Sequence, residues 1–166
     1  MIKKLKETIN FIANSDPAIK SIFEVFLYQG FHALIHHNIA HKFYNKKLFL
    51  LARLISQTSR FLTGIEIHPG AQIDHRVFID HGMGVVIGET AIIGKNVVIY
   101  HGVTLGARST KIEPRHPIIE DNVIIGAHTQ IIGRLLIGHN SKISPNSLLL
   151  ESIPPNSLIK ASINTI

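Results

Sequence analysis

Residues 87–106 read IGETAIIGKNVVIYHGVTLG, and an aliphatic residue returns there at every sixth position: Ile87, Ile93, Ile99 and Leu105. A six-residue period is typical of a parallel β-helix, in which each hexapeptide supplies one short strand and one turn. Three hexapeptides make one triangular coil of about 18 residues, so the repeat residues should stack in three inner columns about 4.8 Å apart. The stretch therefore predicts a solenoid with a dry aliphatic interior.

The same period extends in both directions along the chain, in three frames. The repeat residues are Ile67, Ile73, Ile79, Ile87, Ile93, Ile99, Leu105, Ile119, Ile125, Ile131, Ile137, Ile143 and Leu149, which predict about four coils. Two breaks separate the frames: residues 82–86 displace the period by two positions, and residues 106–118 form a projecting loop. A solenoid tolerates insertions only where its chain faces solvent or a partner, so function is expected at these breaks.

Ahead of Gly64 the apolar residues recur at helical spacing, as in Phe31, Leu34 and Ile35. We therefore expect residues 1–63 to form a helical N-terminal segment, interrupted near Gly30 and Asn45, and residues 64–166 to form the β-helix. Asp16 precedes a proline, which is a typical start of a helix.

Composition excludes several classes of protein. The 166 residues allow one domain, and the absence of cysteine excludes disulfides, thiolate nucleophiles and Cys-ligated zinc. The net charge of +6 lies in residues 1–63, whereas residues 64–166 balance eight basic residues with eight acidic ones, so nucleic-acid binding is not expected. No uncharged run is long enough to span a membrane, and the N-terminus does not resemble a signal peptide. These features predict a cytoplasmic protein.

Several stretches resemble bacterial serine O-acetyltransferase, a member of the hexapeptide-repeat acyltransferase superfamily. They are DPA at 16–18, LYQGFHAL at 27–34, EIHPGA at 66–71, DHGMGVVIGET at 80–90, HGVTLG at 101–106 and RHP at 115–117. The resemblance implies a mainly β fold, a left-handed parallel β-helix preceded by a short helical segment. It also implies acetyl transfer from acetyl-CoA to the hydroxyl of L-serine, which gives O-acetylserine for cysteine biosynthesis.

Acetyl transfer from a thioester to a hydroxyl needs a base that accepts the hydroxyl proton, and imidazole is suited to this near neutral pH. His81 is the candidate. The resemblance implies that Glu66 orients it, at a position where the family carries aspartate, and that His116 is a second functional imidazole. A role for Glu89 as an active-site group or as a turn carboxylate is left open.

Serine is a zwitterion, so its site needs a cation for the carboxylate and acidic groups for the ammonium. The resemblance assigns Arg115 to the carboxylate, and Asp16 and Asp80 to the ammonium; helix capping is the alternative for Asp16. The residues that align with the coenzyme A surface are Gly106, Ala107, Ala127 and Lys142.

The superfamily forms its sites between neighbouring coils, which implies a homotrimer. Cysteine synthase is a conceivable partner, because the family binds it through a terminal isoleucine, here Ile166. Two other classes remain as alternatives: a sugar or polysaccharide O-acetyltransferase of the same fold, and a metal-dependent hydratase or non-enzymatic partner. No metal is predicted, since Asn96 stands where the hydratases carry a histidine and since His37 and His41 are expected to be surface residues.

Overall fold

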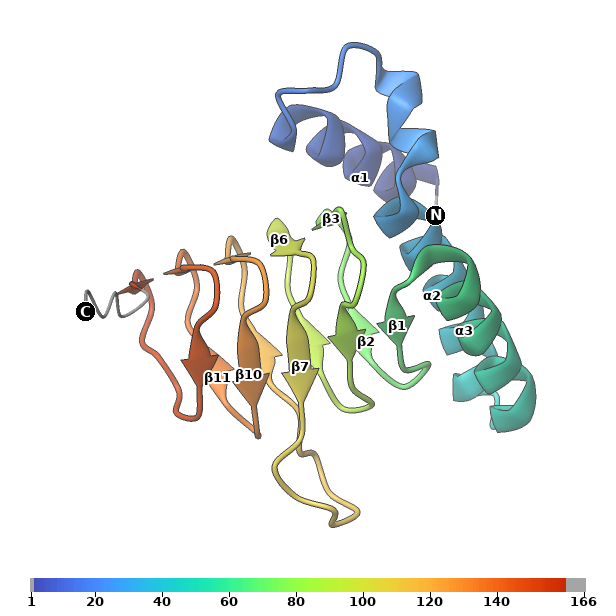
Figure 1. Cartoon of the computed structure of the whole chain (residues 1–166). Coiled ribbons are helices and arrows are strands. Elements are labelled where there is room, and N and C mark those ends of the chain that lie inside the picture. Colours follow the sequence, from blue (N-terminus) through green and yellow to red (C-terminus); the bar gives the residue numbers. More distant parts are fainter. Residues whose placement is uncertain (1, 161–166) are drawn as a thin grey trace.

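In the computed structural model of the chain, residues 2–160 are described (Figure 1). Their strands wind into a parallel β-helix, and the helices lie at its N-terminal end. This arrangement confirms the predicted fold class. Ile166, the residue on which a cysteine synthase contact would depend, lies outside the described residues. Within residues 2–160, none of the helices combines the length and the apolar character needed to cross a lipid bilayer.

The strands form three parallel sheets, one for each side of the triangular coil. The first sheet contains β1 (Glu66–Ile67), β4 (Val86–Ile87), β7 (Thr104–Gly106), β10 (Gln130–Ile132) and β13 (Leu148–Leu149). The second contains β2 (Gln72–Ile73), β5 (Ile92–Ile93), β8 (Ile118–Ile119) and β11 (Leu136–Ile137). The third contains β3 (Val77–Asp80), β6 (Val97–Tyr100), β9 (Ile124–Ile125), β12 (Lys142–Ile143) and β14 (Leu158–Ile159).

The repeat residues pair with one another from coil to coil and form the core. Along the first sheet the register is Ile67, Ile87, Leu105, Ile131 and Leu149. Every predicted repeat residue is buried except Ile73, which is partly buried. The β-helix continues beyond Leu149 through a bridge at Ile153 and the strand β14. The prediction of about four coils is therefore one coil too few. Pro154 and Pro155 interrupt the visible hexapeptide pattern there.

Three corners join the sheets. Corner 1 lies between the third and first sheets and holds His81, His101 and His128; corner 2 lies between the first and second sheets and holds Glu89, Thr90, Arg115 and His116. Corner 3, between the second and third sheets, holds a ladder of Asn96, Asn122, Asn140 and Asn156. These asparagines have φ between 57° and 62°, a left-handed conformation that asparagine tolerates. Each Nδ2 donates to the next Oδ1 at 2.8–3.1 Å.

The stacked columns predict a sharp difference between two neighbouring residues of β11. Ile137 is fully buried, whereas Leu136 points outward and is 40% exposed. Ile137→Ala should lower the free energy of unfolding by about 2–5 kcal/mol, because it leaves a cavity in the column. Leu136→Ala is the matched control, with an expected loss below about 1 kcal/mol. Urea unfolding followed by circular dichroism measures both, and equal losses would contradict the column model.

The helical segment contains α1 (Ile2–Ser15), the 3₁₀ helix η1 (Ile22–Leu27), α2 (Gln29–Asn45) and α3 (Phe49–Thr63). Helix boundaries therefore fall near Gly30 and at Asn45, as the spacing indicated. Asp16 does not begin a helix: it follows α1, and its Oδ1 accepts a hydrogen bond from the Ala18 amide at 2.8 Å. The capping box belongs instead to Ser21 and Glu24 at the start of η1.

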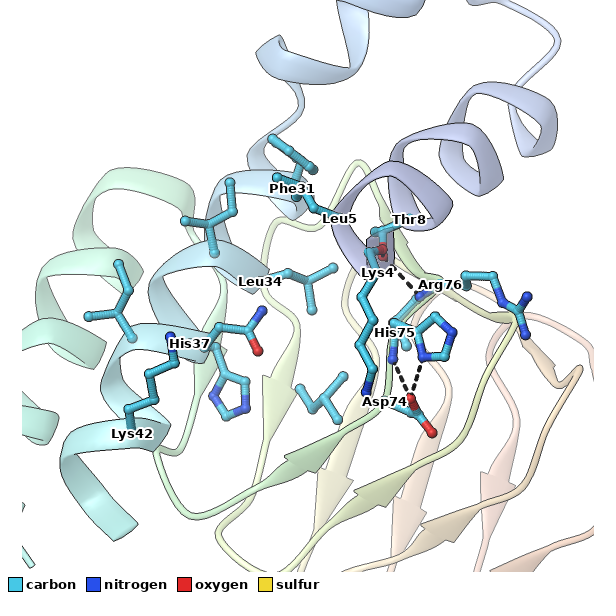
Figure 2. Close-up of a pocket in the computed structure, with 15 residues that line it drawn as sticks. Lys4, Leu5, Thr8, Phe31, Leu34, His37, Lys42, Asp74, His75 and Arg76 are labelled. Carbon is cyan, nitrogen blue, oxygen red and sulfur yellow. Dashed lines mark hydrogen bonds and ion pairs between the residues drawn. The ribbon is translucent and has the colours of Figure 1, made fainter. Parts of the chain in front are cut away.

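Contacts between α1 and the first coil fix the helical segment on the β-helix. Glu7 Oε2 lies 3.0 Å from His75 Nε2, and the Arg76 amide donates to Thr8 Oγ1 at 3.1 Å. Between α1, α2 and the first coil lies a cavity of about 390 Å³, whose lining is drawn in Figure 2. None of the predicted site residues lines it.

His37 lines this cavity from α2 and is only 5% exposed, so its interpretation as a surface residue is wrong. Burial lowers the pKa of His37 to about 3, which keeps the imidazole neutral. His41 Nδ1 lies 2.7 Å from the carbonyl oxygen of Pro69. Both histidines thus pack the helix against the coil. Among the described residues, no group of three or more His, Asp or Glu side chains is arranged to hold a metal ion.

Candidate active site

His81 lies on an insertion at corner 1. Ten residues separate Val77 from Ile87, but only eight separate their partners Val97 and Leu105 in the next coil, so the first coil contains two extra residues. His81 has a φ of 59°, and its side chain is 72% exposed. The shift of the hexapeptide frame in the sequence is therefore the turn that carries the candidate base out of the coil.

A pocket of about 290 Å³ groups His81 with Asp80, Asp16 and Tyr28. Asp80 ends β3, and Asp16 and Tyr28 come from the segments on either side of η1. Tyr28 donates its hydroxyl hydrogen to Asp16 Oδ2. His81 Nε2 lies 3.7 Å from Asp80 Oδ2, which is an electrostatic contact and is too long for a hydrogen bond.

Three carboxylates line this pocket, those of Asp16, Glu24 and Asp80, and the pKa values of Asp16 and Asp80 are shifted in opposite directions. The hydrogen bond from Tyr28, followed by that from the Ala18 amide, lowers the pKa of Asp16, and the same bond to Asp16 raises the pKa of Tyr28 to about 12. Burial raises the pKa of Asp80, and the nearby Asp16 charge acts in the same direction. Within residues 2–160, no lysine or arginine lines the pocket. A small cation that enters would therefore relieve the repulsion between two carboxylates.

Arg115 and His116 lie at corner 2, at the end of the projecting loop, which is drawn in yellow in Figure 1. Arg115 Nη2 donates to Glu89 Oε2 at 3.1 Å, and Tyr44 donates its hydroxyl hydrogen to Glu89 Oε1 at 2.9 Å. Glu89 thus holds Arg115 in place. Within this chain Glu89 is therefore a structural partner of Arg115 and Tyr44, one of the two roles that the sequence left open for it.

His116 is packed closely against the coil. A Cβ at Gly88 would collide with its ring, so glycine is required there for the close approach. His116 Nδ1 lies 2.9 Å from Thr90 Oγ1 and 3.2 Å from the Thr90 amide, which fixes Nδ1 as an acceptor and leaves the hydrogen on Nε2. Burial, and then the Arg115 guanidinium, lower the pKa of His116. Both effects favour the neutral form of the imidazole.

The predicted pair of Glu66 and His81 is not formed in the described part of the chain. Arg60, in the last turn of α3, lies with its Nε 3.3 Å from Glu66 Oε2. The carboxylate beside His81 is that of Asp80. The expectation of a Glu66–His81 contact is corrected on this point, because the α3 guanidinium binds the Glu66 carboxylate.

The candidate residues thus fall into two groups on one chain. Asp16, Asp80 and His81 share corner 1, whereas Arg115 and His116 share corner 2, and one side of the coil separates them.

The residues aligned with coenzyme A are divided in the same way. Gly106 and Ala107 lie at corner 2, where the projecting loop begins, and Ala127 lies at corner 1 next to His128. Lys142 begins β12 and is exposed. A ligand that touches all four from outside the coil must therefore bridge two sides of one chain or lie between two chains.

The repeats match a known family description. A sequence model of the bacterial transferase hexapeptide (six repeats) family matches residues 116–150. A serine acetyltransferase from Staphylococcus xylosus is 52% identical over 159 residues, which are 95% of this chain and 74% of that protein. This chain belongs to the serine acetyltransferase family. A serine acetyltransferase from Staphylococcus aureus (strain N315) is also 52% identical, over 96% of this chain and 75% of its own length.

Solved structures of serine acetyltransferases superpose closely on this chain. Isoform 3 from Entamoeba histolytica, in complex with cysteine, gives a TM-score of 0.94 at 37% identity and covers 99% of this chain and 59% of that one. The Neisseria gonorrhoeae enzyme in complex with serine gives 0.92 at 36% identity, over 97% of this chain and 66% of that one. The chain therefore spans about three fifths to two thirds of the solved serine acetyltransferases and about three quarters of the curated ones.

Two residues of this chain were missed by sequence reasoning. Tyr28 holds Asp16 from twelve residues away, and Arg134 donates from Nη1 to the carbonyl oxygens of Thr90 and His116 at 2.9 and 3.0 Å. Tyr28 lies within a stretch that carries the resemblance, but only its contact with Asp16 reveals a role. Arg134 follows a glycine in an ordinary repeat, where no pattern marks it.

Proposed function

We propose that this chain is an acetyl-CoA-dependent serine O-acetyltransferase whose active site is shared between copies of the chain. The observation that carries the proposal is the pocket at corner 1, where the carboxylates of Asp16, Asp80 and Glu24 and an exposed imidazole meet, with no lysine or arginine among the described residues that line it. Such a pocket accepts an ammonium group and presents a base to a hydroxyl two carbons away. Family membership supplies serine as the acceptor and acetyl-CoA as the donor.

His81 acts as the general base in this proposal. It accepts the hydroxyl proton of serine as the oxygen attacks the thioester carbonyl carbon of acetyl-CoA, and the resulting tetrahedral adduct loses the sulfur. The proton then passes from the imidazolium to the departing thiolate, which gives O-acetylserine and coenzyme A. Asp80, the nearest carboxylate at 3.7 Å, stabilises the imidazolium electrostatically.

The zwitterion of serine is recognised by groups from both corners. Asp16 and Asp80 accept hydrogen bonds from the ammonium, and Tyr28 keeps Asp16 ionised and oriented. Arg115 binds the carboxylate, with Glu89 holding the guanidinium in place and His116 adding its Nε2 hydrogen as a donor. Since these groups lie on different corners of one coil, corner 2 comes from a second copy of the chain.

A homotrimer with one site at each of its three interfaces satisfies this geometry, because a closed ring brings corner 1 of each copy against corner 2 of the next. Coenzyme A then lies along the interface, in contact with Ala127 and Lys142 of one copy and with Gly106 and Ala107 of the other. Formation of O-acetylserine fits a place in cysteine biosynthesis.

Release of free coenzyme A from acetyl-CoA, measured with serine, homoserine and sugar acceptors side by side, tests the function. Serine-dependent release with little release on sugars is the expected result. Release on a sugar that exceeds release on serine would instead support the polysaccharide O-acetyltransferase of the same fold.

Mixing two inactive variants tests the shared site. His81→Ala and Arg115→Ala each damage a different corner, so a mixed ring regains an intact site wherever an Arg115→Ala chain supplies corner 1 and a His81→Ala chain supplies corner 2. Random equal mixing after unfolding and refolding should restore about a quarter of the normal kcat. The unmixed variants, refolded in the same way, are the controls. A mixture no more active than the mean of its components would contradict sharing between copies.

A further inference from the structure

Corner 1 holds more histidines than the proposed chemistry uses. His81, His101 and His128 follow one another at this corner in successive coils, in the direction of Ala127 and away from the helices. The rings of His81 and His101 lie 5.9 Å apart, centroid to centroid, at 82°, and those of His101 and His128 lie 4.8 Å apart at 89°. Both are edge-to-face contacts within the range in which aromatic rings attract one another.

The candidate base has little else to orient it. His81 is 72% exposed in its side chain, and its one polar side-chain contact, with Asp80, is too long for a hydrogen bond. Glu66, which the resemblance assigned to this task, binds Arg60. A general base must nevertheless be held close to its productive geometry, since misplacement by about 1 Å can cost a hundredfold in rate. The ring of His101, 5.9 Å away, is an aromatic contact that can restrict the imidazole of His81.

His101 itself is fixed from its other side. Its carbonyl oxygen accepts the His128 amide at 2.9 Å, and the His128 ring occupies the space that a Cβ at Gly102 would need. Its Nδ1 is buried without a hydrogen-bond partner, while His101 as a whole is partly buried, so among the described residues the inner edge of the ring is held by packing. Along the corner, the His128 ring therefore packs against His101, and the His101 ring packs against the exposed ring of His81.

We propose that His101 is a positioning residue for His81, and that His128 holds His101 in place by filling the space above Gly102. The inference rests on the proposed function, because it assigns His81 the role of base. His101 lies in the HGVTLG stretch but was assigned no role there, and His128 lies outside the stretches that carry the resemblance. The contact is between two aromatic rings, so phenylalanine should replace His101, whereas alanine should not.

Steady-state kinetics of three variants tests the proposal. His101→Ala should lower kcat about tenfold to a hundredfold while the KM values for serine and acetyl-CoA change less than about threefold. His101→Phe should recover most of the lost kcat, and His128→Ala should show a smaller loss than His101→Ala. His139→Ala is the matched control, because His139 is a histidine bound to Glu120 at corner 3, apart from the three rings of corner 1. A normal kcat for His101→Ala, or a His101→Phe variant as slow as His101→Ala, would overturn the positioning role.

Nuclear magnetic resonance of the His81 ring separates this inference from the function itself. With ¹³C-labelled histidine, the His81 Cε1–H resonance, identified by its loss in His81→Ala, should shift in His101→Ala because the ring current of His101 is removed. It should stay unchanged in His139→Ala. If the unmodified protein releases no coenzyme A with serine, the proposed function fails while this shift still reports the contact. An unchanged resonance in His101→Ala would show that the rings do not meet, whatever the activity.

Discussion

Replacing His81 with alanine should lower kcat by about 10² to 10⁴, the usual contribution of a positioned general base. Among the described residues, His81 supplies the one imidazole that lines the corner 1 pocket, and its side chain projects from a two-residue insertion. Its removal leaves the inner columns untouched, so circular dichroism and light scattering should be those of the unmodified protein. Glu66→Gln should have a smaller effect, since Glu66 contacts Arg60 and not His81.

Initial rates of coenzyme A release with saturating serine and acetyl-CoA give this comparison directly. A His81→Ala variant with near-normal turnover would make His116 the preferred base. His116 is neutral but is packed against Gly88 and Thr90, and a role as base would require its Nε2 to lose the hydrogen that the Thr90 contact assigns to it.

An acceptor that lacks both charges of serine should react far more slowly than serine. Each charged hydrogen bond contributes about 1.5–3 kcal/mol, so the loss of one lowers kcat/KM about tenfold to a hundredfold. Serine amide lacks the partner of Arg115, and N-acetylserine lacks the partner of Asp16 and Asp80. N-acetylserine amide lacks both, and its kcat/KM should fall about 10² to 10⁴ below that of serine. A sugar should also be a poor acceptor, because its binding would leave these charged groups without partners.

The Arg115→Ala variant tests whether Arg115 is the group that recognises the serine carboxylate. It should remove most of the preference for serine over serine amide, and the KM for acetyl-CoA should change little. Equal kcat/KM values for serine and N-acetylserine amide in the unmodified protein would exclude the amino-acid site. The corner 1 carboxylates would then need another explanation.

Much of the fold could be predicted because the hexapeptide period records a repeated environment. Ile87, Leu105 and Ile131 each face the same inner column, so a single rule covers them all. The breaks were equally visible: fourteen residues separate Leu105 from Ile119, where six separate their partners Ile87 and Ile93, so eight residues are extra. The last coil was missed because Pro154 and Pro155 replace the usual pattern.

The site was less predictable, because its contacts join segments that no period relates. The binding of Glu66 to Arg60 depends on how α3 packs on β1, and the burial of His37 depends on how α2 packs on the first coil. The types of residue were nevertheless informative, since both corners carry the charges that a zwitterion requires. The sequence did not reveal that the acidic groups and Arg115 lie at different corners of one chain.

The insertion at corner 1 has a consequence for how such proteins evolve. In this scaffold a reactive group arises through a change in length at a surface turn, not through an exchange of residues in the strands. Lengthening a turn is thermodynamically mild, at about 0.6 kcal/mol for each doubling of a flexible loop, whereas one altered column residue costs several times as much. New reactive groups therefore arise at the turns of each coil, whereas the stability of the fold depends on its column residues. A duplicated gene could gain or lose two codons at a turn and explore new chemistry while its product stays folded.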